Sequence, residues 1–228
     1  MRLASQLMFV LAVAAAAPAG AADDRSQLPL PVRPCAVCHG NDGISELPGI
    51  PHLAGQKVDY LVKQTWQMHL SASALGGHGA GQPEGLPPLH ATRWTEHREN
   101  RTMARQTATL GEADIRAIAE YFAGKSRACP PSGVERGPRI ALIERCAICH
   151  GLDGIGATPH VPHLAGQNRL YLADQIQKMR SAERGEVFID AETARASGIM
   201  GPQSLPIPEE QIVALAQWFA NSQCPDKK

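Results

Sequence analysis

Two short runs of cysteine and histidine offer the most specific chemistry in this chain. They are Cys35-Ala36-Val37-Cys38-His39 and Cys146-Ala147-Ile148-Cys149-His150. Two cysteines three residues apart lie on one face of a helical turn, where their sulfurs can reach the two vinyl groups of one porphyrin. The histidine that follows is carried to the iron and supplies the proximal nitrogen. In an exported protein such a C-x-x-C-H run indicates a covalent c-type haem attachment site, so two runs predict two haems.

A zinc site is the alternative chemistry for these residue types. Two cysteines and a histidine would then need a fourth ligand from elsewhere in the chain. Export of the protein, duplication of the run and the pattern downstream of it favour haem. The expected haem attachment residues and proximal iron ligands are Cys35, Cys38, His39, Cys146, Cys149 and His150.

The start of the chain has the features of a secretory signal peptide. Arg2 precedes an apolar run over residues 3–17, and small residues lead to Ala21 and Ala22. A basic start, a short apolar core and a small-residue end are typical of a cleaved segment. An uncleaved anchor is the alternative, but the run falls short of the roughly 20 residues that a span needs. We expect residues 1–22 to be removed and the protein to lie in the periplasm.

Composition sets limits on the remaining part of the chain. Lys plus Arg and Asp plus Glu both number 22, and no basic stripe of the kind that binds nucleic acid is present. Aromatic residues make up only 4% of the chain. A lobe of about 100 residues with so few large side chains would have a thin core, which a buried porphyrin would fill.

The two halves of the chain are copies of each other. At an offset of 111 residues (146 − 35), segment 39–44 falls on 150–155 and the run Pro-His-Leu-Ala-Gly-Gln at 51–56 falls on 162–167. The offset then drops to 97 (200 − 103), so the first copy carries 14 extra residues, which we place in the glycine-rich stretch 76–83. This self-similarity predicts two domains, at 23–129 and 139–228, joined by a linker at 130–138.

The apolar spacing predicts an all-α fold with long loops. Helices are expected at residues 58–70, 112–123, 139–146, 169–181 and 208–221, where apolar side chains recur along one face. No strand pattern competes with them. Three prolines, Pro29, Pro31 and Pro34, stand where the second copy has its helix at 139–146. Because a helix interior does not tolerate proline, we expect an extended segment there.

The full set of motifs resembles the dihaem class I cytochromes c of the cytochrome c4 family. The resemblance is carried by the two C-x-x-C-H runs, two Pro-x-Leu-Ala-Gly-Gln runs, and an Arg-x-x-x-x-Met followed by a terminal Ala-x-Tyr/Trp-Phe helix. It covers nearly all of the mature chain. It implies two tandem cytochrome c lobes related by a pseudo-twofold axis, each wrapped round one covalent haem, that act as a periplasmic electron carrier.

The resemblance also implies a sixth iron ligand in each lobe. Met103 and Met200 match the family's ligand methionine, and both stand in expected loops ahead of the terminal helix. A thioether ligand raises the reduction potential relative to a second histidine. Filling of the core is the alternative role of a methionine. The family's proline two residues after this methionine is present as Pro202, but Arg105 replaces it in the first copy.

Four further residues acquire roles from the resemblance. Pro51 and Pro162 match the proline whose carbonyl accepts a hydrogen bond from the proximal imidazole, which orients the ring. Arg98 and Arg195 are candidates to pair with haem propionates, with a solvated surface position as the alternative. Five histidines have no counterpart in the other copy, and we expect surface or loop positions for them: His69, His78, His90, His97 and His160.

Three functions remain open on this sequence. If both irons are six-coordinate, no position is left for a substrate, and the chain is an electron shuttle rather than an enzyme. Its redox partners would be a quinol-oxidising complex or dehydrogenase upstream and a terminal oxidase downstream, with peripheral association to such membrane complexes. The alternatives are the dihaem cytochrome subunit of a periplasmic sulfur-compound or alcohol dehydrogenase, and a dihaem enzyme with one open iron position.

Two cysteines lie outside the haem runs. Cys129 and Cys224 each follow the terminal helix of their own copy. In an oxidising compartment they can form a disulfide between the copies. Two separate thiols are the alternative, because a bridge needs Cα atoms within about 7 Å of each other.

Overall fold

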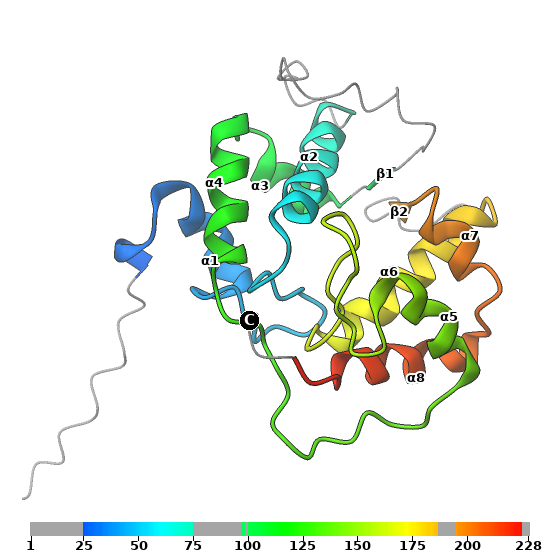
Figure 1. Cartoon of the computed structure of the whole chain (residues 1–228). Helices are drawn as coiled ribbons and strands as arrows, with labels where there is room; N and C mark the ends of the chain where they lie inside the picture. Colours follow the sequence, from blue (N-terminus) through cyan, green and yellow to red (C-terminus); the bar gives the residue numbers. More distant parts are fainter. Residues whose placement is uncertain (1–24, 75–96, 99, 187–194, 225–228) are drawn as a thin grey trace, which may run out of the picture.

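The protein consists of two helical lobes that lie side by side (Figure 1). The computed structural model describes residues 25–74, 97–98, 100–186 and 195–224. The first lobe contains η1 (Arg25–Gln27), η2 (Leu30–Val32), α1 (Arg33–His39), α2 (Val58–Ala74), β1 (His97–Arg98), α3 (Arg101–Thr107) and α4 (Glu112–Ala123). The second contains α5 (Ala141–His150), α6 (Arg169–Glu183), β2 (Arg195–Ala196), α7 (Met200–Ser204) and α8 (Glu209–Ala220). The expected signal peptide and the glycine-rich stretch 76–83 lie outside the described residues.

Each lobe is built round its terminal helix. In α4 the buried residues Ile115, Ile118, Ala119 and Phe122 follow the spacing of one helix face. In α8 the same face carries Ile212, Leu215, Ala216 and Phe219, all buried. Helix α2 packs on α3 and α4, and α6 packs on α7 and α8. The two copies therefore repeat one packing scheme, as the duplication predicts.

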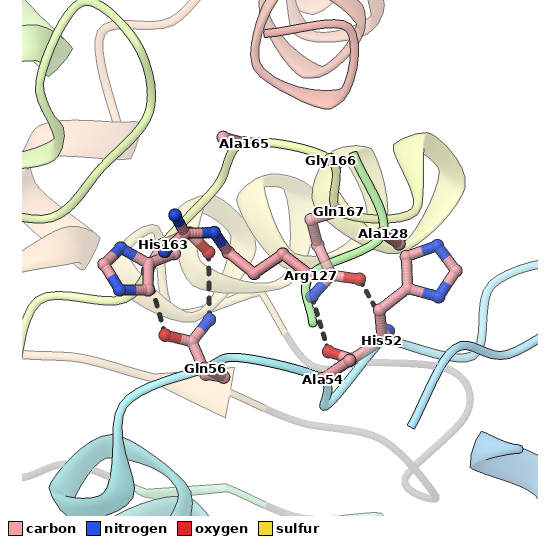
Figure 2. A pocket seen from close by; sticks show the side chains of 9 residues that line it. All are labelled: His52, Ala54, Gln56, Arg127, Ala128, His163, Ala165, Gly166 and Gln167. Atoms are coloured by element: carbon pink, nitrogen blue, oxygen red, sulfur yellow. Dashed lines mark hydrogen bonds between the residues drawn. The ribbon is translucent and has the colours of Figure 1, made fainter. Parts of the chain in front are cut away.

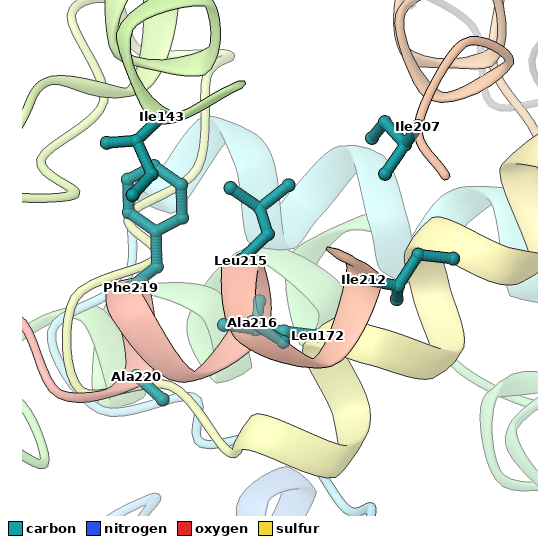
Figure 3. Close-up of a cluster of buried hydrophobic side chains, with 8 residues drawn as sticks. All are labelled: Ile143, Leu172, Ile207, Ile212, Leu215, Ala216, Phe219 and Ala220. Atoms are coloured by element: carbon teal, nitrogen blue, oxygen red, sulfur yellow. The ribbon is translucent and has the colours of Figure 1, made fainter. Parts of the chain in front are cut away.

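The second lobe has the larger apolar cluster (Figure 3). Phe219 of α8 stands against Ile143 of α5 at one end, and Ile212 lies below Ile207 at the other. Its fully buried members are Ile143, Leu172, Ile207, Ile212, Leu215, Ala216, Phe219 and Ala220. The corresponding cluster of the first lobe contains Val32, Leu61, Ile118, Ala119 and Phe122.

The expected helices are present, with small differences at their ends. Helix α2 runs four residues beyond the expected end at 70, and α5 begins at Ala141 rather than at 139. The prediction of an extended segment before the first haem run is wrong, because this part of the chain forms helical turns. Its prolines stand in the first turns of η2 and α1, where the missing N–H has no helical partner to lose.

A strand pair and a disulfide both join the lobes. Strands β1 and β2 pair antiparallel, with Arg98 opposite Arg195, a two-residue ladder that the sequence pattern did not predict. Cys129 and Cys224 form a disulfide with a Cα–Cα distance of 5.5 Å. The bridge joins the segment after α4 to the segment after α8, so the two lobes are linked covalently just beyond their terminal helices.

Candidate functional site

The two C-x-x-C-H runs occupy equivalent helical turns in the two lobes. They form the C-terminal part of α1 and of α5, and each helix ends at its histidine. Cys35 and Cys146 are partly buried, whereas Cys38 and Cys149 are exposed. None of the four takes part in a disulfide. The spacing of three residues places both sulfurs of a run on one side of the helix, as attachment to one porphyrin requires.

The histidines of both runs are oriented by a backbone carbonyl. The Nδ1 atom of His39 donates to the carbonyl oxygen of Pro51 at 2.9 Å, and that of His150 donates to Pro162 at 3.2 Å. Since a carbonyl can only accept, the proton is on Nδ1 and the Nε2 lone pair is left for a metal. Burial lowers the pKa of both imidazoles, which favours the neutral form that binds iron.

A glycine turn fixes the proline that orients each histidine. The carbonyl oxygen of Gly43 accepts from the amide of Leu53 at 2.7 Å, and Gly154 accepts from Leu164 at the same distance. Gly43 has a φ of +78°, and a Cβ placed on it would lie 2.8 Å from the amide nitrogen of Ala54. No other residue type can therefore occupy this turn without moving the loop that carries Pro51.

The candidate sixth ligands stand in short helices rather than in loops. Met103 lies inside α3, and Met200 is the first residue of α7. Both side chains are partly exposed. The amide of Met103 donates to the Asn100 side chain at 2.9 Å, which caps α3. The expectation of loop positions is thus wrong for both, because the polar residue ahead of each methionine starts a helical turn.

Arg98 and Arg195 lie between the lobes, in β1 and β2. Arg98 donates to the hydroxyl of Tyr171 at 3.0 Å and to Gln64. Arg195 donates to the hydroxyl of Tyr60 at 3.2 Å and to Gln175 at 2.5 Å. Each arginine therefore bonds to a tyrosine of the opposite lobe. A solvated surface position is excluded for both, since their side chains are half-buried.

Two buried glutamines cross the boundary between the lobes in the same reciprocal way. Gln56 donates to the carbonyl of His163 and accepts from its amide, both at 2.9 Å. Gln167 donates to the carbonyl of His52 at 2.8 Å and accepts from its amide at 2.7 Å. Figure 2 shows the two pairs on either side of the Arg127 side chain. The cavity between them holds only about 10 Å³, so the lobes meet in a close fit.

The glutamine contact places two histidines in different surroundings. His52 accepts at Nδ1 from the amide of Ser45 at 3.0 Å. The Nδ1 atom of His163 is buried and has no partner in the described part of the chain. Burial, followed by the nearby charges of Lys57 and Arg127, lowers the pKa of His163 to about 4. Both histidines directly follow the prolines that orient the proximal imidazoles.

The histidines without a counterpart do not share one environment. His160 is exposed, in agreement with expectation. His69 is not a surface residue: it is 2% exposed, and its Nδ1 donates to the carbonyl of Thr107 at 2.7 Å. The expectation was wrong because position 69 faces α3, which the helical spacing of α2 alone does not show. His78, His90 and the side chain of His97 lie outside the described residues.

These arrangements fit haem better than zinc. Each lobe offers two cysteine sulfurs and an imidazole Nε2, which match the vinyl groups and the iron, and in the first lobe Arg98 lies near His39. Within the described residues, no group of three or more His, Cys, Asp or Glu side chains could enclose a metal ion. The fourth zinc ligand that the alternative needs is therefore absent from that part of the chain.

A search of the described helices for a membrane span found none that is sufficiently long and apolar.

Comparison with known proteins agrees with this geometry. The Cytochrome c family matches residues 134–223, within the second copy. Cytochrome c4 of Azotobacter vinelandii is 32% identical over 161 residues, which cover 66% of this chain and 69% of that protein. The thiosulfate dehydrogenase electron acceptor of Stutzerimonas stutzeri is 28% identical over 191 residues, covering 82% of this chain and 78% of that one.

A solved structure extends the similarity to the whole arrangement. The crystal structure of reduced recombinant cytochrome c4 from Pseudomonas stutzeri aligns with a TM-score of 0.56 and 25% identity, over 85% of this chain and 95% of that one. Sequence identity, shared fold and the paired haem runs lead to one conclusion. The chain belongs to the cytochrome c4 family, whose members carry electrons on haem c and are not enzymes.

Proposed function

We propose that the protein is a periplasmic carrier with two covalent haems, each six-coordinate through His39 and Met103 or through His150 and Met200. The observation that carries this proposal is the repetition of one proximal arrangement in two lobes, with His Nδ1 held by the proline carbonyl twelve residues on. A haem iron with two protein ligands supplies a one-electron couple and leaves no position for a substrate.

The chain's own residues would hold each cofactor from three sides. Cys35 with Cys38, and Cys146 with Cys149, would form the thioether links. Pro51 and Pro162 hold the proximal rings, so the imidazoles need not reorient when the iron changes charge. Met103 and Met200 would approach from α3 and α7. Ligands held in this way would be fixed before the charge moves, which would keep reorganisation small.

Arg98 and Arg195 are proposed to hold propionates at the boundary between the lobes. Guanidinium groups bind carboxylates with paired hydrogen bonds. In the structure both groups bond to neutral side chains of the two lobes, Tyr171 and Gln64 for Arg98 and Tyr60 and Gln175 for Arg195. A propionate bound here would lie beside side chains of both lobes, so the charge state of one haem would be felt at the other.

We propose a quinol-oxidising complex or a dehydrogenase as electron donor and a terminal oxidase as acceptor. A second candidate follows from the relative named as an electron acceptor of thiosulfate dehydrogenase, which resembles 82% of this chain. In that role the protein would receive electrons from thiosulfate oxidation. Docking of electron-transfer partners usually buries little surface and is transient, so both roles are compatible with the same carrier.

Two measurements test the proposal. Mass spectrometry of the protein from the periplasm should give the chain without residues 1–22 plus two haems, and a single haem or bound zinc would overturn it. Stopped-flow reduction then separates the donors. Fast reduction by thiosulfate dehydrogenase with thiosulfate, but not by a quinol-oxidising complex, would establish the second role. Stable co-purification with a dehydrogenase subunit would instead identify a subunit of an enzyme.

A further inference from the structure

One position of the duplicated chain carries different residues that both bond to a backbone carbonyl near the end of the methionine-bearing helix: the last residue of α3 in one lobe and a residue just beyond α7 in the other. His69 in α2 and Arg180 in α6 are equivalent in the alignment of the copies, and both are buried, at 2% and 7% exposure. His69 donates from Nδ1 to the carbonyl of Thr107 at 2.7 Å. Arg180 donates from Nη1 to the carbonyl of Ile207 at 2.8 Å. Each contact therefore spans from the long helix of a lobe to the segment that carries its methionine.

In the first lobe this contact leads directly to the methionine. Thr107 is the last residue of α3, and its hydroxyl donates to the carbonyl of Met103 at 2.9 Å. Asn100 holds the other end of α3 through the Met103 amide at 2.9 Å. Ser71, also in α2, donates to the carbonyl of Arg98 at 2.7 Å. Helix α2 thus holds α3 at its last residue, Thr107, and holds the chain just before its first residue at Arg98.

The anchors of the two lobes differ in strength. Arg180 is charged, and it also forms an ion pair with Glu209 at the start of α8. His69 makes one hydrogen bond, and its Nε2 is buried without a partner in the described part of the chain. Its ring packs edge-on against Trp66, with centroids 5.0 Å apart. Charge-assisted hydrogen bonds are about twice as strong as neutral ones, so the Arg180 contact holds the segment just after α7 more firmly than the His69 contact holds the end of α3.

We propose that this position is the residue that places the methionine-bearing helix against the haem, and that His69 makes Met103 the more easily displaced ligand. The inference rests on the proposed ligation by Met103 and Met200. His69 and Arg180 are positioning residues, because they touch backbone carbonyls rather than the cofactor. The first haem is then the one that opens to an external ligand.

Displacement of methionine by imidazole in the ferric protein tests the proposal. The wild-type protein should bind imidazole in two phases, the tighter one at the first haem. H69L should tighten that phase about tenfold, the equivalent of roughly 1.4 kcal/mol for a lost hydrogen bond and an unpaired carbonyl. H69N places an amide nitrogen where Nδ1 stands and should restore the wild-type value. R180M should tighten only the weaker phase.

R180H provides a second route if H69L fails to fold. It converts the second anchor to the type of the first, and it should bring the two imidazole affinities closer together. Equal affinity changes at both haems in H69L, or none at either, would overturn the anchor. The ferric methionine–iron charge-transfer band distinguishes failure of Met103 ligation from failure of the His69 anchor. If wild-type protein lacks the band of the first haem, Met103 ligation and the anchor both fall; if H69L keeps the full band and wild-type imidazole binding, only the anchor falls.

Discussion

The buried apolar cluster of the first lobe has five members, one of them Phe122, whereas that of the second lobe has eight, one of them Phe219. Beside the methionine-bearing helix the first lobe also buries four polar residues, Gln67, His69, Ser71 and Thr107. The proximal sides, in contrast, repeat each other, from the histidine–proline hydrogen bond to the glycine turn. The copies have kept the side that attaches haem and have diverged on the side that supplies the sixth ligand.

This difference indicates which contacts are needed twice. Lys57 donates to the carbonyl of Thr158 at 2.5 Å, and its counterpart Asn168 donates to that of Leu47 at 3.4 Å. The two side chains differ, but the carbonyls are equivalent. Contacts across the lobe boundary are therefore conserved between copies as positions.

Cutting the disulfide should have the largest effect on this pairing. The bridge between Cys129 and Cys224 closes a sequence separation of 95 residues. Loss of a native bridge typically costs about 2–4 kcal/mol, so C129S/C224S should unfold at lower urea concentration. The second lobe, with its larger core, should persist longest and give a separate transition. A single transition at the wild-type midpoint would contradict the role of the bridge.

The crossed glutamines should have equal effects in the two lobes. Q56A leaves the peptide groups of His163 unpaired, and Q167A does the same to His52. Buried unpaired groups cost about 1–3 kcal/mol, and this loss should appear in the free energy of unfolding of each variant. Q203A, at an exposed position, serves as the control. A cost for one glutamine at least twice that of the other would show that the boundary is not symmetric.

The two tyrosines at the boundary should differ from each other. Y171F removes a partner from Arg98, which retains Gln64, while Y60F removes a partner from Arg195, which retains both Gln64 and Gln175. We expect about 1 kcal/mol for Y171F and less for Y60F, measured by urea unfolding. The matched control is Y121F, which removes a hydroxyl that donates to the carbonyl of Asn41 at the surface. Equal costs would place the two arginines in equivalent networks.

The smallest effect concerns pH. The pKa of His163 is lowered to about 4 in the folded protein, so the unfolded chain binds the proton more readily. Stability should therefore fall as pH drops from about 6.5 towards 4, because the neutral ring is required for folding. H163Q should flatten the dependence of stability on pH in this range. The measurement is the urea midpoint of unfolding at several pH values between about 4 and 6.5. An unchanged slope would assign the pH dependence to other groups.

The helices, and the placement of both C-x-x-C-H runs at helix ends, were predictable because they depend on local patterns. The terminal helices follow from the spacing of apolar residues that includes Phe122 and Phe219, and each haem run follows from three residues within a stretch of five. The contacts between the lobes were not predictable, since a glutamine repeated in both copies, such as Gln56 and Gln167, can serve either the cofactor or the other lobe. Their duplication was the available signal, but duplication alone does not separate a residue that contacts the cofactor from one that contacts the other lobe.

Two errors have the same physical origin. Irregular backbone was expected before Cys35, because proline disfavours a helix interior, and around Met103, which was placed in a loop ahead of the terminal helix. The structure has helix starts at both places, where proline and an Asn cap are stabilising. A short helix of seven residues or fewer has hardly any interior, so propensities for the interior do not describe it.

The most direct test of the central claim is the ligation of both irons in the wild-type protein. The ferric form should show a methionine–iron charge-transfer band with an intensity for two sites per chain, and the reduced form should not bind carbon monoxide rapidly. M200A and M103A should each remove about half of the band, as expected when each iron holds one thioether. Half the band in the wild-type protein, with one carbon monoxide bound per chain, would contradict a carrier with two closed irons.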